Sequence, residues 1–208
     1  MSAPTTREKL LSAAVTLFAE KGYRDATVAD VCEHAHANIA SVNYHFQSKE
    51  NLFRHVLREA FRLTNEVYPI DGGLTGDDPA EKRLRAFMSA VIRRSFDPGA
   101  AGCFHRILIH EGTREAAPDD VVHAEMAMLQ GNHLMEILSL MLGTKSKEIL
   151  SCVKVNIIAL SVFPSVMPRM RDVLFCGRPT SAKLERFIER QFAFALAGIG
   201  TLQAASVK

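Results

Sequence analysis

Four residues between positions 39 and 43 have side chains that suit contact with the edges of DNA bases. Asn43 can form a bidentate pair with adenine, and the hydroxyl of Ser41 can reach several base edges. Ile39 or Ala40 can contact the methyl group of thymine. Such groups recognise a duplex when one short helix presents them together, so the neighbouring sequence must supply that helix.

The surrounding residues predict two short helices joined by a tight turn. Thr27 can cap the first helix, because its hydroxyl can accept an N–H of the first turn while Asp30 reaches back in a capping box. Apolar residues then recur at helical spacing in two sets, Val28, Val31 and Cys32, and then Ile39, Val42 and Phe46. Two helices separated by three or four residues form a helix-turn-helix, whose second helix fits the DNA major groove.

Several positions of this segment agree with one known pattern at fixed spacing. They are Thr27-Val28, the run Asn43-Tyr44-His45-Phe46, Ser48-Lys49-Glu50 with Leu52-Phe53, and Phe18 to Gly22-Tyr23 upstream. With these residues the chain resembles the DNA-binding module of the tetracycline-repressor (TetR) family over residues 6 to about 55. Members usually have Gly in the turn, where φ is positive. Here the residue is His36, which tolerates the left-handed region better than most residues.

The resemblance implies which residues hold the DNA backbone. Tyr44, His45 and Lys49 would contact phosphates, as would Thr27 at the start of the first of the two helices. Their chemistry agrees, since a phenol, an imidazole and an ammonium are donors of different reach. For each of them, and for Ser41, the alternative is an ordinary solvated helix face.

The overall charge does not indicate a nucleic-acid-binding protein. The 208 residues have a formal net charge of +2, and basic and acidic residues are equal in number over positions 1–54. The motif therefore predicts DNA binding through a few placed contacts and helix N-termini. A hydrophobic fraction of 48% with 23% charged residues indicates a globular chain able to bury a core.

The cysteines and the N-terminus predict a cytoplasmic protein. Four cysteines without a C-x-x-C pair, two of them (Cys32 and Cys152) on apolar helix faces, are typical of small buried residues in a reducing compartment. The first residues, MSAPTTREKL, lack the apolar core of a signal peptide. The most apolar segment, 149–167, contains Lys154, Asn156 and Pro164, which favours a buried helix over a membrane span.

Helical spacing continues along the whole chain and predicts an all-α protein of nine or ten helices. We expect caps at Thr5 or Thr6, Ser48, Asp119 and Ser181, helix ends at Gly22 and Gly143, and a long helix from Ser48 to about Val67. The predicted domains are a helix-turn-helix head over 1–50 and a helical ligand-binding and dimerisation bundle over 51–208. The head and the long helix share a core, so no flexible linker separates them.

Two helices of the second domain predict self-association. Residues 149–163 are apolar nearly all round, and Phe187, Gln191, Phe194 and Ala195 add a second largely apolar face to the last helix. Such surfaces must be covered. Together with HRILIHEGTRE (residues 105–115) these helices resemble, more loosely, the CecR-like branch of the TetR family, which implies a twofold four-helix bundle. A homodimer also places two heads on a palindrome.

A pocket for a small hydrophobic or amphipathic ligand is expected within residues 80–175. Adaptable methionine and aromatic side chains suggest it, although ordinary core packing explains any single one. The predicted lining comprises Phe87, Met88, Phe104, His105, Met126, His133 and Phe163. The spacing of His105, His110, His123 and His133 provides no i, i+4 pair, so no metal site is predicted.

These features favour a ligand-responsive DNA-binding transcriptional regulator that acts as a homodimer, with repression as the favoured sign. An enzyme is the second class, but the sequence has no activated nucleophile pair, Gly-rich phosphate loop or metal spacing, and hence predicts no cofactor. The third class is a dimeric protein-interaction module whose head does not bind DNA. The zero net charge of the head and the presence of His36 in the turn favour it.

Overall fold

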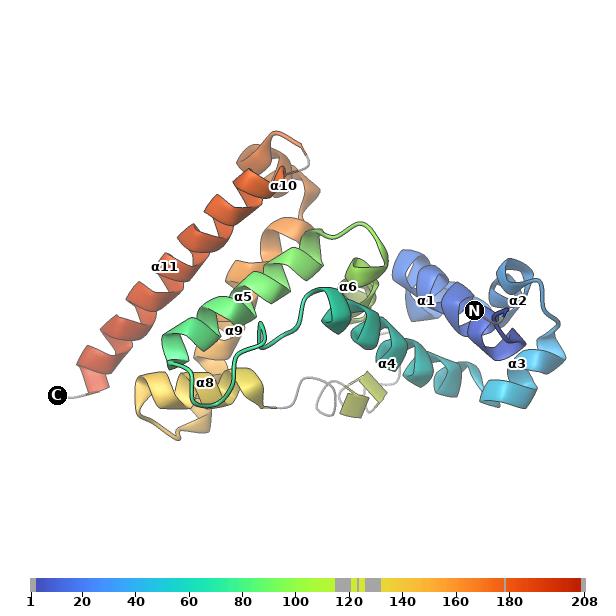
Figure 1. Cartoon of the computed structure of the whole chain (residues 1–208), viewed down its shortest axis with the longest axis horizontal. Helices are drawn as coiled ribbons and strands as arrows, with labels where there is room; N and C mark the ends of the chain where they lie inside the picture. The colour runs from blue at the N-terminus through green and yellow to red at the C-terminus, as the bar shows by residue number, and fades with distance from the viewer. Residues whose placement is uncertain (1–2, 115–120, 123, 126–131, 178, 207–208) are drawn as a thin grey trace. The chain divides into compact units, whose positions relative to one another are not determined.

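The structure, a computed structural model, describes residues 3–114, 121–122, 124–125, 132–177 and 179–206. Every regular element in these ranges is a helix (Figure 1), which confirms the predicted all-α fold class. The contacts group the chain into two compact units, Met1–Val67 with Asp97–Gly131, and Tyr68–Phe96 with Asn132–Lys208. The predicted boundary at residue 50 separates the chain by sequence pattern and stays a prediction.

The first unit contains the N-terminal helices together with elements that follow later in the chain. Its elements are α1 (Thr6–Asp25), α2 (Val28–Ala35), α3 (Ile39–Phe46), α4 (Lys49–Val67), the short 3-10 helix η1 (Ala100–Gly102) and α6 (Cys103–Arg114). Their core joins α1, α2, α3, α4 and α6 and includes Leu10, Phe18, Val42, Phe46, Leu52, Phe53, Phe104 and Ile107. Each fully buried large side chain contributes about 1.5–3 kcal/mol relative to exposure.

Side-chain caps set the starts of the N-terminal helices as expected. The hydroxyl of Thr5 accepts the N–H of Glu8, and the carboxylate of Glu8 accepts the N–H of Thr5. Thr27 and Asp30 form the same reciprocal pair. The hydroxyl of Ser48 accepts the N–H of Asn51 at 3.0 Å at the start of α4. Each cap satisfies backbone donors that a helix start otherwise leaves unpaired.

Gly22 has the positive φ expected of a helix end, but the chain does not leave the helix there. Its φ and ψ are 77° and 174°, and helical residues continue to Asp25 beyond this kink. A Cβ at this position would lie 3.1 Å from the Cβ of His110 on α6. Both the backbone angle and this close approach favour glycine.

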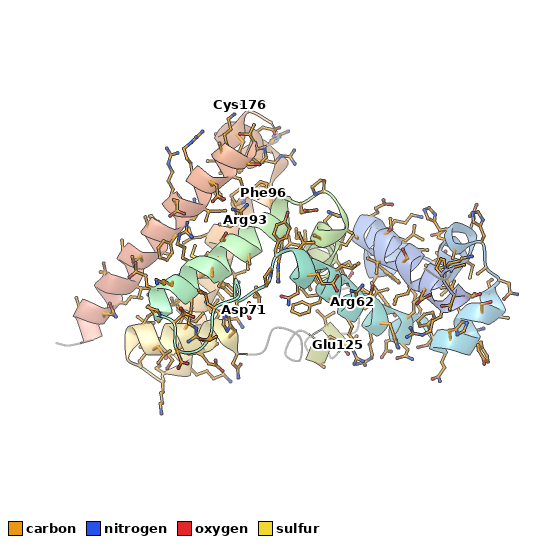
Figure 2. All side chains as sticks on the ribbon, in the orientation of Figure 1. Arg62, Asp71, Arg93, Phe96, Glu125 and Cys176 are labelled. Carbon is orange, nitrogen blue, oxygen red and sulfur yellow. The ribbon has the colours of Figure 1, made fainter. Side chains whose placement is uncertain are left out.

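The second unit consists of α5 (Ala80–Phe96), α8 (His133–Leu142), α9 (Lys147–Val166), α10 (Pro168–Phe175) and α11 (Ser181–Ser206). Its larger core lies among α5, α8, α9 and α11, and a smaller one gathers Ile92, Phe175, Phe187 and Ile188 with Phe96 (Figure 2). Arg94 of α5 is 4% exposed and donates from Nε to the carbonyl of Tyr68 at 3.0 Å. Burial lowers the pKa of this guanidinium to about 10.

Helix boundaries in the second unit agree with the sequence at one end and differ at another. Gly143 ends α8 with a φ of 63°, as predicted. The cap of α11 is Thr180 rather than Ser181, since the hydroxyl of Thr180 accepts the N–H of Lys183 and Ser181 is already helical. The predicted cap at Asp119 lies outside the described residues.

Helix α9 is only partly covered within one protomer. By length and composition it could cross a membrane, a test that core helices of soluble proteins also pass. Only 28% of its most apolar window is buried, so the prediction of a buried helix is correct for one face of α9 and wrong for the rest. Leu150, Val153 and Ile157 face the core, whereas Val155 is 65% and Phe163 49% exposed. A large part of this apolar helix therefore remains on the surface of the single chain.

The cysteines do not all behave as the sequence predicts. All four are free thiols; Cys32 and Cys103 are buried, whereas Cys152 and Cys176 are exposed. The prediction that the cysteines are buried is therefore wrong for Cys152 and Cys176. On α9, Leu150 and Val153 occupy the inward face, and Cys152 points outward.

Candidate nucleic-acid interface

The turn between α2 and α3 has the geometry that a helix-turn-helix needs. His36 adopts the left-handed conformation, with φ 49° and ψ 47°. The N–H of Ala37 donates to the carbonyl of Cys32 at 2.9 Å and closes the end of α2. The expectation that His36 replaces the usual glycine in this conformation is confirmed.

Packing fixes which face of α3 points outward. Val42 is 1% and Phe46 0% exposed, and both pack against the helices of the first unit. Their spacing of four residues places both on one side of α3. The opposite side is therefore available to a partner.

The predicted base-contacting residues lie on or beside this outward face. Ala40 and Asn43 are exposed, and Ile39 is 54% exposed. Ser41 is half-buried, and its hydroxyl donates to the side-chain oxygen of Asn38 at 3.0 Å. Asn38 is the cap of α3, so Ser41 is partly engaged in holding the helix start.

The predicted phosphate-contacting residues differ in how free they are. Tyr44 is 83% exposed, and its ring meets that of His45 edge to face at 4.9 Å. Lys49 instead folds back, with Nζ 4.7 Å from the ring centre of Tyr23 and 3.4 Å from the carbonyl of Arg24. Burial lowers the pKa of its ammonium. The hydroxyl of Thr27 accepts the N–H of Asp30 and keeps its own proton for a further acceptor.

Helix α6 anchors the head through a contact that the sequence analysis did not predict. Glu111 is 6% exposed and accepts the backbone N–H of Tyr23 at 2.9 Å. Tyr23 also packs edge to face on Phe53 of α4 at 4.9 Å. One signal was available in the sequence, because Glu111 follows Phe104 and Ile107 at helical spacing and so falls on their buried face.

A second buried carboxylate, that of Glu125, holds α4 through Arg58 within the same unit. Glu125 is 2% exposed and receives two hydrogen bonds from the guanidinium of Arg58, at 2.7 and 2.8 Å (Figure 2). A bidentate pair of this kind fixes orientation as well as distance.

The predicted ligand-lining residues are distributed over both units. Phe87 and Met88 lie in the core of the second unit, where the ring of Phe87 is 6.4 Å from that of His133. Phe104 lies in the core of the first unit and packs on Phe61, and His105 follows it on α6. Met126 lies outside the described residues. The lining role of all these residues stays a prediction.

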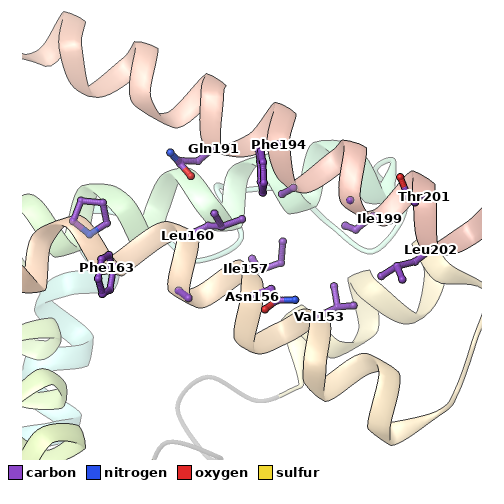
Figure 3. A pocket seen from close by; sticks show the side chains of 14 residues that line it. Val153, Asn156, Ile157, Leu160, Phe163, Gln191, Phe194, Ile199, Thr201 and Leu202 are labelled. Carbon is purple, nitrogen blue, oxygen red and sulfur yellow. The ribbon is translucent and has the colours of Figure 1, made fainter. Parts of the chain in front are cut away.

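Phe163 lies on a different feature, an apolar groove between α9 and α11 of the second unit. The groove has a volume of about 820 Å³, and its lining includes Val153, Leu160, Phe194 and Leu202 (Figure 3). Phe194 is 70% and Leu202 41% exposed. Two helices thus present one continuous apolar surface.

Comparisons with known proteins agree with the N-terminal geometry. Residues 10–56 match the family described as bacterial regulatory proteins, tetR family. The biofilm operon icaADBC HTH-type negative transcriptional regulator IcaR of Staphylococcus epidermidis is 32% identical over 74 residues, which are 32% of this chain and 40% of IcaR. The chain thus spans less than half the length of this curated relative.

Solved structures resemble almost the whole chain in fold. A tetR family transcription regulator from Shewanella sp. PV-4 has a TM-score of 0.66 at 13% identity, over 94% of this chain and 98% of that one. AibR in complex with isovaleryl coenzyme A and operator DNA has a TM-score of 0.68 at 16% identity, over 91% and 97%. Residues 10–56 therefore carry the signature of the tetR family of bacterial regulatory proteins, and the chain as a whole shares the fold of these solved structures.

Proposed function

We propose that the chain is a DNA-binding transcriptional regulator that reads an operator with α3. The observation that carries the proposal is the outward face of α3, where Tyr44, Asn43 and Ile39 are exposed while Val42 and Phe46 fix the helix from behind. A short helix held in this way, after a left-handed turn, has the form that enters a major groove.

The proposed contacts follow from the chemistry of the exposed groups. Asn43 recognises adenine, Ile39 or Ala40 contacts a thymine methyl, and Ser41 reaches a base edge after leaving its bond to Asn38. Tyr44, His45, Lys49 and Thr27 hold phosphates and set the register. For Lys49 this requires that its ammonium, now against Tyr23, also faces the duplex.

The proposed working form is a cytoplasmic homodimer, joined by the apolar surface of α9 and α11, that binds a palindromic operator. Pairing of two copies would cover Val155, Phe163 and Phe194 together, which a single chain leaves exposed. Twofold symmetry would then place two copies of α3 on successive major grooves.

The proposed regulation is release of the operator, and hence derepression, when a small ligand binds the helical bundle. AibR, which shares the fold, was solved with both isovaleryl coenzyme A and operator DNA, which supports a ligand with an apolar part. The ligand must prefer one conformation by several kcal/mol, since equal affinity for both shifts nothing.

Selection of genomic fragments that the purified chain retains, repeated with candidate ligands, tests the proposal. We expect enrichment of a palindromic sequence and gel shifts that weaken steeply with salt. If no fragment binds even at low salt, where phosphate contacts are strongest, the chain is instead a dimeric protein-interaction module. That second function is favoured by the equal numbers of acidic and basic residues in the head.

A further inference from the structure

Arg83, near the start of α5, is a buried cation whose hydrogen-bonding capacity is largely unmet. It is 6% exposed, and its Nε has no hydrogen-bond partner among the residues that the structure describes. Its Nη1 is 3.5 Å from the carbonyl oxygen of Gly76, a long distance for such a bond. Burying a charged group without acceptors is costly. Nε is closed to solvent, so an anion from outside the chain would balance the charge of the guanidinium rather than bond to Nε.

Arg83 lines a surface groove of about 690 Å³ in the second unit, between the start of α5, α8 and the start of α9. Lys145 and Lys147 line the same groove and are exposed. Within the part of the chain that the structure describes, neither lysine forms an ion pair. Two unpaired ammonium groups therefore lie on the wall from which the guanidinium of Arg83 can be reached.

The start of α9 adds a further attraction for an anion. Ser146, between the two lysines, caps this 20-residue helix, and its hydroxyl accepts the N–H of Ile149. The N-terminus of a helix carries a partial positive charge and backbone N–H groups that bind anions. Glu148 in the first turn of α9 reduces this attraction but does not line the groove. Among the described residues that do line it, three cations stand against one carboxylate, Glu136.

The neighbouring His133 does not neutralise this excess. Burial, followed by the charge of Arg83, lowers the pKa of its imidazole, and Asp71 and Glu136 act weakly in the opposite direction. Its Nε2 is buried without a hydrogen-bond partner in the described structure. An imidazole carries no negative charge in either protonation state, so His133 leaves the positive charge of Arg83 uncompensated from this side.

We propose that this groove binds a phosphate group of a small molecule. Arg83 forms its floor, Lys145 and Lys147 its charged wall, and the N-terminus of α9 its end. A dianionic phosphate matches several cations at once, whereas a carboxylate carries a single charge and matches a lone guanidinium. The proposal does not depend on DNA binding and can be tested without DNA.

Inorganic phosphate is the probe, added to the full chain while amide chemical shifts are followed by NMR. Sodium acetate and sodium chloride are added in parallel at matched ionic strength. We expect saturable shifts of the amides of Lys145 and Lys147 with phosphate and not with the other salts. The variant Lys145→Gln with Lys147→Gln should bind phosphate at least about fivefold more weakly. Both side chains are exposed, so this variant should fold normally.

Lys154→Gln is the matched control, since Lys154 is an exposed lysine on α9 that does not line the groove. We expect its affinity for phosphate to equal that of the original chain. Arg83→Gln is the second variant and should abolish saturation where a melting curve shows that it folds. Non-saturating shifts, equal shifts with acetate, or equal weakening by Lys154→Gln would overturn the proposal.

Discussion

At the scale of single residues, Asn43 and Tyr44 are adjacent on α3 but should act differently. Asn43→Ala removes a bidentate contact to one base and should cost about 1–3 kcal/mol on the selected operator, with little effect on unrelated DNA. Tyr44→Phe removes one phosphate donor and should weaken all sequences about equally, by about 1 kcal/mol. Competition binding assays measure both. Equal loss of specificity in the two variants would contradict these roles.

The sequence predicts these residues well because helical periodicity is local. The spacing of Val42 and Phe46 predicts that both point inward and that Asn43 and Tyr44 point outward, and their exposure agrees. Spacing alone does not predict the state of Ser41 and Lys49. The hydroxyl of Ser41 donates to Asn38, the cap of the same helix. Lys49 packs on Tyr23, a residue that folding brings close.

At the scale of elements, the contact between α6 and the end of α1 should be important for the stability of the head. Glu111→Ala leaves the partly buried N–H of Tyr23 without its acceptor and should lower the free energy of unfolding by about 1–3 kcal/mol. Glu111→Gln keeps an oxygen acceptor and should cost less. Denaturant unfolding measures both, with the exposed Glu20→Ala as control. Equal stability of all three variants would show that the contact contributes nothing.

Elements were predictable from local signals, and their partners were not. The capping residues Thr5, Thr27 and Ser48 mark helix starts by chemistry within three residues. By contrast, Phe87 and Phe104 are the same residue type, and only the folded structure shows that they lie in separate cores. Whether the donors of Arg83 find acceptors likewise depends on contacts between α5 and elements distant in the chain, and Nε finds none in the described structure.

At the scale of the whole molecule, the apolar surface of α9 and α11 should hold two copies together. Phe194→Asp places a charge in the groove and should weaken the dimer roughly 10- to 100-fold, about the value of one buried aromatic side chain. Val173→Asp is the matched control, because Val173 is 78% exposed and lies on α10, outside the groove. Sedimentation equilibrium measures the dissociation constant. A monomeric starting protein, or equal weakening by both variants, would contradict the dimer proposal.

In the proposed homodimer, self-association would link the apolar helices to the reading of DNA. One copy of α3 would contact a single half-site, and symmetric pairing would add the second without a new contact in the head. The sequence anticipated this surface from the composition of residues 149–163. The described structure adds that Val155 and Phe163 are exposed in one protomer.

Footprinting of the purified chain on its selected operator tests the central claim most directly, that α3 reads DNA from a symmetric pair. The account predicts two protected half-sites with centres about 34–36 Å apart along one face of the duplex, both lost in Asn43→Ala at concentrations that saturate the original chain. Protection of a single half-site, or a footprint that Asn43→Ala leaves unchanged, would contradict it.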